Sequence, residues 1–336
     1  MVRFHLNGVP REYAGDPSRT LLLFLRDDLG VISAKDGCSQ AACGACTVQL
    51  DGKAVLACAT KMSRLEGHSV TTVEGLAPAV QKTFAEAFAQ KAGAQCGFCI
   101  PGIVMRSDAL LKERPAPSRE ELAKALAPHL CRCTGYVKIV DAILLAAKSL
   151  RENVPLKPRE GSGRVGESLP KLGTRDVALG RRPFAHDLAL PGMLHCALKL
   201  SEKPRARLLR LDLSEALKAE GVERILTAAD VPGERRVGQI EQDWPVFVAP
   251  GEEIRYCGDV LAAVVAKSRD AARRAAALIR AEFEDLEPVC RPEDSRETLA
   301  ASRMSKGDAE AAFKDCAFVV EQSYRTQLIE HAFLET

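Results

Sequence analysis

Eight of the twelve cysteines in this 336-residue chain lie between positions 38 and 133, in two groups of four. Each group requires the fold to bring four thiols together, which constrains the structure more than overall composition does. The N-terminal sequence MVRFHLNGVPREY has no apolar core of the kind that directs secretion. In a chain that is not exported, clustered cysteines are expected to bind metal or carry redox chemistry rather than form disulfides.

The first cysteine set follows the spacing C-x4-C-x2-C-x11-C. The loop over residues 37–46 consists almost wholly of small residues, so its backbone N–H groups can approach the bridging sulfides of an iron–sulfur cluster. The C-x4-C-x2-C spacing is that of plant-type ferredoxins. The fourth cysteine follows a hairpin expected at Asp51-Gly52. This set is predicted to hold one [2Fe–2S] cluster on Cys38, Cys43, Cys46 and Cys58.

The second cysteine set joins C-x2-C to C-x-C across 31 intervening residues. Residues 95–102, QCGFCIPG, are expected at the N-terminus of a helix, and residues 131–135, CRCTG, in the turn that enters another helix. Free N–H groups and the helix dipole favour thiolate at such positions. Two helix N-termini facing each other would form a four-thiolate pocket. A second [2Fe–2S] cluster is therefore predicted on Cys96, Cys99, Cys131 and Cys133.

Three other interpretations of the cysteines compete with this one. Structural zinc sites usually pair C-x2-C with a second C-x2-C, a spacing that neither set has, and zinc is kept as the alternative metal. Disulfides would require export, and thioredoxin-like chemistry at Cys96 and Cys99 would require a βαβ context that the pattern lacks. The other four cysteines stand alone and are expected to be small buried apolar residues: Cys196, Cys257, Cys290 and Cys316.

The pattern of apolar residues, turns and prolines predicts an α+β multidomain chain. Residues 1–76 indicate a β-grasp domain of the [2Fe–2S] ferredoxin type with one helix. Residues 77–150, rich in Ala, Leu, Glu and Lys, predict a four-helix domain. Residues 151–165 are polar and rich in Pro and Gly, which indicates a linker. Strands and helices mix over residues 166–290, and residues 291–336 are expected to begin a further domain.

Individual elements follow from the same pattern. The first domain is expected to have strands over 2–6, 11–13, 47–50, 53–57 and 69–73 and a helix over 21–28. In the second, the expected helices are 78–91, 103–112, 118–127 and 137–150, the third with a capping box formed by Ser118 and Glu121. Later strands are expected over 193–200, 207–211, 222–227, 260–266 and 318–328, and a helix over 271–283.

Charge and hydropathy exclude several classes of partner. The formal net charge is +2 and the charged residues are scattered, so the chain presents no basic field for nucleic acid. No apolar run approaches the about 18 residues of a membrane-spanning helix. The chain is therefore expected to be cytoplasmic, with neither nucleic acid nor a membrane span.

Several motifs resemble those of one enzyme family. QCGFCIPG (95–102) and CRCTGY (131–136) are similar to the iron–sulfur portion of the molybdenum hydroxylases, the xanthine dehydrogenase and aldehyde oxidoreductase family. Residues 166–290 resemble the small α/β "hammerhead" domain that opens the family's molybdenum subunit, through the segments PGMLH, VERILTAAD and IRYCGD. The segment HAFLET (331–336) resembles the start of the molybdopterin-binding domain, so residues 291–336 would be its truncated beginning.

The resemblance implies an oxidoreductase with a defined electron path. In that family a molybdenum–molybdopterin centre hydroxylates an aldehyde or an N-heterocycle such as a purine, using oxygen from water. Electrons then leave through two [2Fe–2S] clusters to flavin or an external acceptor. On this pattern the second cysteine set would hold the molybdenum-proximal cluster and the first set the distal one. Gln95 and the Cys133 backbone match positions that contact molybdopterin in the family.

The resemblance also implies partners. The family's catalytic residues have no counterpart here, so no catalytic residue is predicted and the chain is expected to work within a longer or multi-subunit enzyme. Its partners would be a molybdopterin-binding domain or subunit and, because no FAD domain is recognised in the chain, a separate FAD subunit or an external acceptor. The full enzyme is expected to be a homo-oligomer. The alternative is a stand-alone [2Fe–2S] carrier without catalytic activity, which residues 166–290 disfavour.

Overall fold

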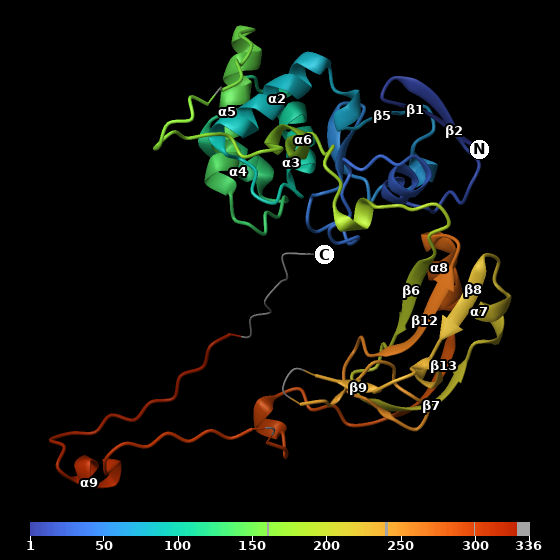
Figure 1. Ribbon diagram of the computed structural model, residues 1–336, viewed down its shortest axis with the longest axis vertical. Coiled ribbons are helices and arrows are strands. Elements are labelled where there is room, and N and C mark those ends of the chain that lie inside the picture. The colour runs from blue at the N-terminus through green and yellow to red at the C-terminus, as the bar shows by residue number, and fades with distance from the viewer. Residues whose placement is uncertain (160, 239–240, 299, 328–336) are drawn as a thin grey trace. The chain divides into compact units, whose positions relative to one another are not determined.

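The structure is a computed structural model that describes residues 1–159, 161–238, 241–298 and 300–327. The chain divides into two compact units, one from Met1 to Leu188 and the other from Ala189 onward (Figure 1). Among the described residues, no helix is both long enough and apolar enough to cross a membrane. The cysteine sets both lie in the first unit.

A five-stranded sheet forms the first part of this unit, in the order β2-β1-β5-β3-β4. Strand β1 pairs in parallel with β5, and the two hairpins β1–β2 and β3–β4 are antiparallel. Both hairpin turns place their two central residues at positive φ, at Asn7-Gly8 and Asp51-Gly52, which suits the right-handed twist of the strands. The strands are β1 (Val2–Leu6), β2 (Val9–Tyr13), β3 (Thr47–Leu50), β4 (Lys53–Leu56) and β5 (Ser69–Thr71).

The helix expected over residues 21–28 packs on this sheet in two forms. One α-helical turn, α1 (Leu21–Leu23), widens into a π-helix, η1 (Phe24–Asp28). The Thr20 side chain caps its start by accepting the N–H of Leu23. Its apolar residues share a core with the sheet: Phe4, Leu6, Leu21, Leu22, Phe24, Leu25, Val48 and Val70. The β-grasp arrangement is completed by two short 3₁₀ turns, η2 (Met62–Arg64) and η3 (Val73–Gly75).

Helices make up the second part of the first unit, beside the sheet (Figure 1). Over residues 77–153, all of them described, they are α2 (Pro78–Lys91), α3 (Ile100–Glu113), α4 (Arg119–Leu126) and α5 (Tyr136–Glu152). The predicted capping box is present, because Ser118 and Glu121 exchange side-chain-to-backbone hydrogen bonds at the start of α4. The largest fully buried residues of this core include Phe84, Phe88, Ile100, Ile103, Met105 and Leu122.

The chain returns to this unit after an irregular stretch that follows α5. The short helix α6 (Thr174–Ala178) contacts α2 and α3, and the 3₁₀ turn η4 (Ala185–Asp187) follows it. Val177 and Leu179 are buried in the helical core. Residues 174–188 therefore pack with the cysteine-bearing domains.

The second unit combines strands with two helices that cover one sheet. One three-stranded sheet has the order β6-β12-β8, a second has the order β11-β7-β13, and β9 pairs with β10. Helix α8 packs on β6 and β12 through an alanine-rich face. The elements are β6 (His195–Leu200), β7 (Ala206–Asp212), α7 (Ser214–Lys218), β8 (Val222–Leu226), η5 (Ala228–Asp230), β9 (Arg236–Val237), β10 (Trp244–Pro245), β11 (Glu253–Ile254), β12 (Val260–Ala266), α8 (Arg269–Leu278) and β13 (Arg280–Asp285).

Two expected elements of the second unit are wrong. The helix predicted over residues 271–283 ends at Leu278, and β13 replaces its second half because Ala281 and Phe283 alternate inward while pairing with β7. The strand predicted over residues 318–328 is not formed over 318–327, where the side chains are exposed and no neighbouring strand pairs with the chain; residue 328 lies outside the described residues. Beyond β13 the described chain forms η6 (Pro292–Asp294) and α9 (Ala309–Lys314).

Candidate metal centres

The first cysteine set is gathered by the β3–β4 hairpin and the loop before it. Cys46 leads into β3, and Cys58 returns beside it after β4, where the N–H of Ala57 donates to the Cys46 carbonyl at 3.2 Å. The four thiols approach each other in pairs, Cys38 with Cys43 and Cys46 with Cys58. Cys43 and Cys46 are buried, whereas the other two are half-buried.

Small residues in this loop are required by space. A Cβ on Gly37 would lie 3.1 Å from the Cys43 Sγ, so a side chain there would crowd the thiol. Gly44 has φ +75°, and a Cβ on it would lie 2.8 Å from the carbonyl oxygen of Pro128. Ser39 and Ala41 also adopt left-handed backbone conformations, so the whole loop is strongly curved.

Backbone N–H groups point at one thiol of the first set. The N–H groups of Gln40 and Ala42 each donate to the Cys38 Sγ, both at 3.4 Å. Burial alone would raise the pKa of Cys38, but these donors lower it below its usual value. Burial raises the pKa of Cys43 to about 11 and that of Cys46 to about 12. The thiol pairs are therefore protonated at neutral pH without metal, and a metal that binds them would displace protons.

The second cysteine set lies at two helix N-termini, as the sequence predicted. Cys99 is the N-cap residue of α3, and Cys131 and Cys133 lie in the turn before α5. The thiols again form two pairs, Cys96 with Cys133 and Cys99 with Cys131. The hydrogen bond from Cys99, together with backbone N–H donors of residues 133–135, lowers the pKa of Cys131 to about 6. The same hydrogen bond and burial raise the pKa of Cys99.

This two-by-two pairing fits a cluster of two irons. Each iron of a [2Fe–2S] cluster takes two thiolates, so the four sulfurs need to meet only in pairs. A structural zinc ion would need all four around one point. Among the described residues, no three His, Cys, Asp or Glu side chains form a group that could hold one metal ion. The small-residue loop, the N–H donors and the paired thiols suit the two-iron group better.

The two cysteine sets are in direct contact through the main chain. The N–H of Leu130, next to Cys131, donates to the carbonyl of Cys43 at 2.9 Å. A Cβ on Gly102 at the start of α3 would lie 2.6 Å from the carbonyl oxygen of Gly44. The backbones of the two ligand loops therefore touch without an intervening side chain, a contact that the sequence did not indicate.

The two residues matched to molybdopterin contacts lie together. The Gln95 Nε2 donates to the Cys133 carbonyl at 3.1 Å, and Gln95 is partly exposed. Lys171 donates to the Gln95 carbonyl. Gln95 and Cys133 therefore present an amide and a backbone group beside the second cysteine set.

The four remaining cysteines are exposed, which corrects the prediction that they are buried. Cys196 lies on β6, whose residues alternate between half-buried and exposed, and it falls on the exposed face. Cys257 lies in a turn, and Cys290 and Cys316 lie in segments that lack packing partners among the described elements. None of them is near the two sets in the sequence, and each is free.

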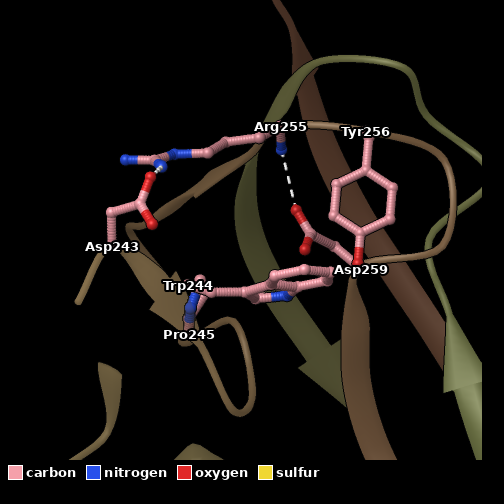
Figure 2. A pocket seen from close by; sticks show the side chains of 6 residues that line it. All are labelled: Asp243, Trp244, Pro245, Arg255, Tyr256 and Asp259. Carbon is pink, nitrogen blue, oxygen red and sulfur yellow. Dashed lines mark hydrogen bonds and ion pairs between the residues drawn. The ribbon is translucent and has the colours of Figure 1, made fainter. Parts of the chain in front are cut away.

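The second unit has a pocket of about 330 Å³ that the sequence did not indicate (Figure 2). The Trp244 and Tyr256 rings meet edge to face, with centroids 5.6 Å apart. Arg255 pairs with Asp243 at 3.0 Å on one side, while the buried Asp259 carboxylate accepts the Arg255 backbone N–H at 2.8 Å. These hydrogen bonds fix the turn over residues 254–259, part of a motif noted in the sequence.

Family models match both parts of the chain. The "2Fe-2S iron-sulfur cluster binding domain" matches residues 20–83, and the "[2Fe-2S] binding domain" matches residues 72–144. The "Aldehyde oxidase and xanthine dehydrogenase, a/b hammerhead domain" matches residues 179–287. Fold and motifs thus define an iron–sulfur protein with two [2Fe–2S]-binding domains followed by a hammerhead domain.

Known proteins place this architecture in one family. Aldehyde oxidoreductase of Megalodesulfovibrio gigas is 35% identical over 300 residues, 84% of this chain and 33% of the relative. The nicotinate dehydrogenase small FeS subunit of Eubacterium barkeri is 38% identical over 148 residues, 44% of this chain and 94% of that subunit. The solved aldehyde oxidoreductase of Desulfovibrio desulfuricans superposes with a TM-score of 0.75 at 35% identity, covering 90% of this chain and 35% of the other. This chain belongs to the molybdenum hydroxylase family of xanthine dehydrogenase and aldehyde oxidoreductase.

The chain spans about a third of the length of the aldehyde oxidoreductases that it matches. By contrast, it covers nearly the whole of the small iron–sulfur subunits of the nicotinate dehydrogenases, 94% in Eubacterium barkeri and 97% in Pseudomonas putida. The iron–sulfur domains are therefore represented completely.

Proposed function

We propose that this chain is the electron-transfer portion of a molybdopterin-dependent hydroxylase that acts on aldehydes or N-heterocycles. A molybdenum centre in a further domain or subunit would hydroxylate the substrate with oxygen from water, and flavin or an external acceptor would take the electrons. The observation that carries the proposal is the pair of four-cysteine sets whose ligand loops touch through the Leu130–Cys43 hydrogen bond.

The chain's own residues would perform three tasks in this function. The two cysteine sets hold one [2Fe–2S] cluster each, on the ligands predicted from the sequence. The touching backbones fix the separation of the two sets, which favours electron transfer because tunnelling falls steeply with distance. Gln95 and the Cys133 backbone would face molybdopterin, which makes the second set the molybdenum-proximal one and the first set the distal one.

Iron analysis and electron paramagnetic resonance (EPR) test the cluster assignment. The dithionite-reduced chain should show two distinct [2Fe–2S] signals and about four irons. Cys43→Ser should abolish the first-set signal and leave the second, with about two irons remaining. The matched control is Cys196→Ser, an exposed cysteine that should change neither quantity. A colourless protein that contains zinc would refute the iron–sulfur assignment.

A stand-alone electron carrier would give the same EPR spectra, so a second measurement separates it from the proposal. The protein isolated from its own source, together with any chain it assembles with, should contain molybdopterin and reduce an acceptor when an aldehyde or an N-heterocycle is added. Two normal clusters without associated molybdopterin would favour the carrier. The hammerhead match over residues 179–287 supports the hydroxylase, because a carrier has no evident use for that domain.

A further inference from the structure

Residues 174–188, here named the clasp, contact both iron–sulfur domains. Gly180 lies where the domains meet: a Cβ on it would be 2.7 Å from the Ser33 Cα and 3.1 Å from the Pro101 Cγ. Its φ of +68° also favours glycine. The middle of the clasp therefore fits closely between a loop of the β-grasp domain and the first turn of α3.

The N-terminal half of the clasp is seated on the helical domain. A Cβ on Gly97, between the ligands Cys96 and Cys99, would lie 1.7 Å from the Val177 Cγ1, so Val177 fills the space that glycine leaves. The Arg175 Nε donates to the Glu86 carboxylate at 2.8 Å, and the Glu86 side chain is only 4% exposed.

The C-terminal half of the clasp is held by buried charge. The Asp187 carboxylate is fully buried and accepts hydrogen bonds from Lys35 and Arg26, both at 2.6 Å. The Lys35 ammonium is itself fully buried and lies 4.9 Å from the centre of the Phe184 ring. Phe184 also meets Phe98, which stands between two predicted ligands, at 5.3 Å between centroids. Buried charges persist only when they are paired, so this contact requires both the clasp and the β-grasp domain.

The peptide that leads to the clasp contributes little to this fit. Val165 and Leu172 are almost fully exposed, and residues 161–173 form no helix or strand. The small FeS subunit of Eubacterium barkeri, of which 148 matched residues make up 94%, is long enough for the two iron–sulfur domains but not for a clasp in addition. In such a subunit the corresponding surface is open to a segment of another chain.

We infer that the clasp is a docking segment that binds the iron–sulfur portion to the hammerhead-bearing portion of this protein, and that it holds the two together without the peptide connection. The occupant of the surface is residues 174–188, delivered by the chain that carries the hammerhead domain. Asp187, paired with Lys35 and Arg26, makes this docking specific to the β-grasp domain.

The test cuts the chain between the two portions. A protease recognition sequence is inserted after Val165 in the 336-residue chain, the protein is loaded with iron and sulfide, and it is then cut. The cut halves should migrate together in size-exclusion chromatography at micromolar concentration and retain both EPR signals. Separation of the unaltered halves would overturn the inference.

Variants of the charged contact make the test specific. In the cut protein, Asp187→Ala should weaken the association at least about a hundredfold, because it leaves Lys35 and Arg26 facing each other without a counter-charge. The neutral pair Lys35→Met with Asp187→Leu should restore much of the association, whereas Arg182→Ala, an exposed position in the clasp, should leave it unchanged. An Asp187→Ala protein that binds as tightly as the unaltered one would also overturn the inference. Loss of the clusters with intact association would contradict the proposed function instead.

Discussion

At the scale of single residues, Asp187 and Lys35 show how far a side chain can act from its place in the sequence. The hydrogen bond between them joins positions 152 residues apart, and the one to Arg26 joins positions 161 apart. Burial lowers the pKa of Lys35, while the nearby Asp187 and Glu74 oppose that shift. Burial alone would raise the pKa of Asp187, but hydrogen bonds from Lys35, the Phe184 N–H and Arg26 lower it to about 2. The carboxylate is therefore charged throughout the neutral range.

We expect Asp187→Asn to lower the free energy of unfolding of the first unit by about 3–5 kcal/mol, because two buried cations lose their partner. The pKa of Asp187 is depressed in the folded state, so its stabilisation is complete above the ordinary value of 3.8 and is lost only as the pH falls from there toward 2. The difference between the two proteins should thus stay constant between about pH 5 and about pH 8. Urea titrations at several pH values measure it, and a difference that shrinks within this range would contradict the assignment.

At the scale of elements, the local rules predicted most of the structure. The hairpin turns, the capping box at Ser118 and the strand over residues 260–266 all follow from short-range chemistry that the sequence displays. Helix α8 was extended too far because the alternating inward pattern of Ala281 and Phe283 also fits a helix over a few residues. The first helix was placed correctly, but its π-helical second part depends on tertiary packing that periodicity does not report.

Ser118 offers a quantitative check at this scale. We expect Ser118→Ala to remove both the capping hydrogen bond to the Glu121 N–H and the register for its reciprocal partner, which costs about 1 kcal/mol of stability. Thermal unfolding followed by circular dichroism should show a lower Tm, with Ser18→Ala, outside any helix, as a comparison. An unchanged Tm would mean that α4 is held by packing of Leu122 and Leu126 alone.

At the scale of the whole molecule, the two cysteine sets were predictable and their contact was not. Ligand spacing is local and specific, so both sets could be assigned from the sequence. The Leu130–Cys43 hydrogen bond and the clasp depend on how separate domains pack, and neither leaves a periodic signal. The pocket of Trp244 and Tyr256 was missed for the same reason, since its rings come from two different strands and turns.

Thiol alkylation distinguishes ligation from burial across the chain. Five cysteines are exposed: Cys96, Cys196, Cys257, Cys290 and Cys316. In the iron-loaded protein, we expect the last four to react quickly and Cys96 to be protected, because its sulfur would be bound to iron. After chelation of the iron, Cys96 should react as well. Mass spectrometry of the labelled peptides measures this, and equal labelling of Cys96 before and after chelation would refute its role as a ligand.

The hydrogen bond between the two ligand loops has a consequence for how the sequence can evolve. Both partners belong to the main chain, and the Leu130 side chain is 57% exposed. Almost any residue at position 130 therefore supplies the same N–H donor, and only proline lacks it. Mutational drift can rewrite the surface around the junction while the junction itself is inherited unchanged, so the sequence there is free to adapt to different partners.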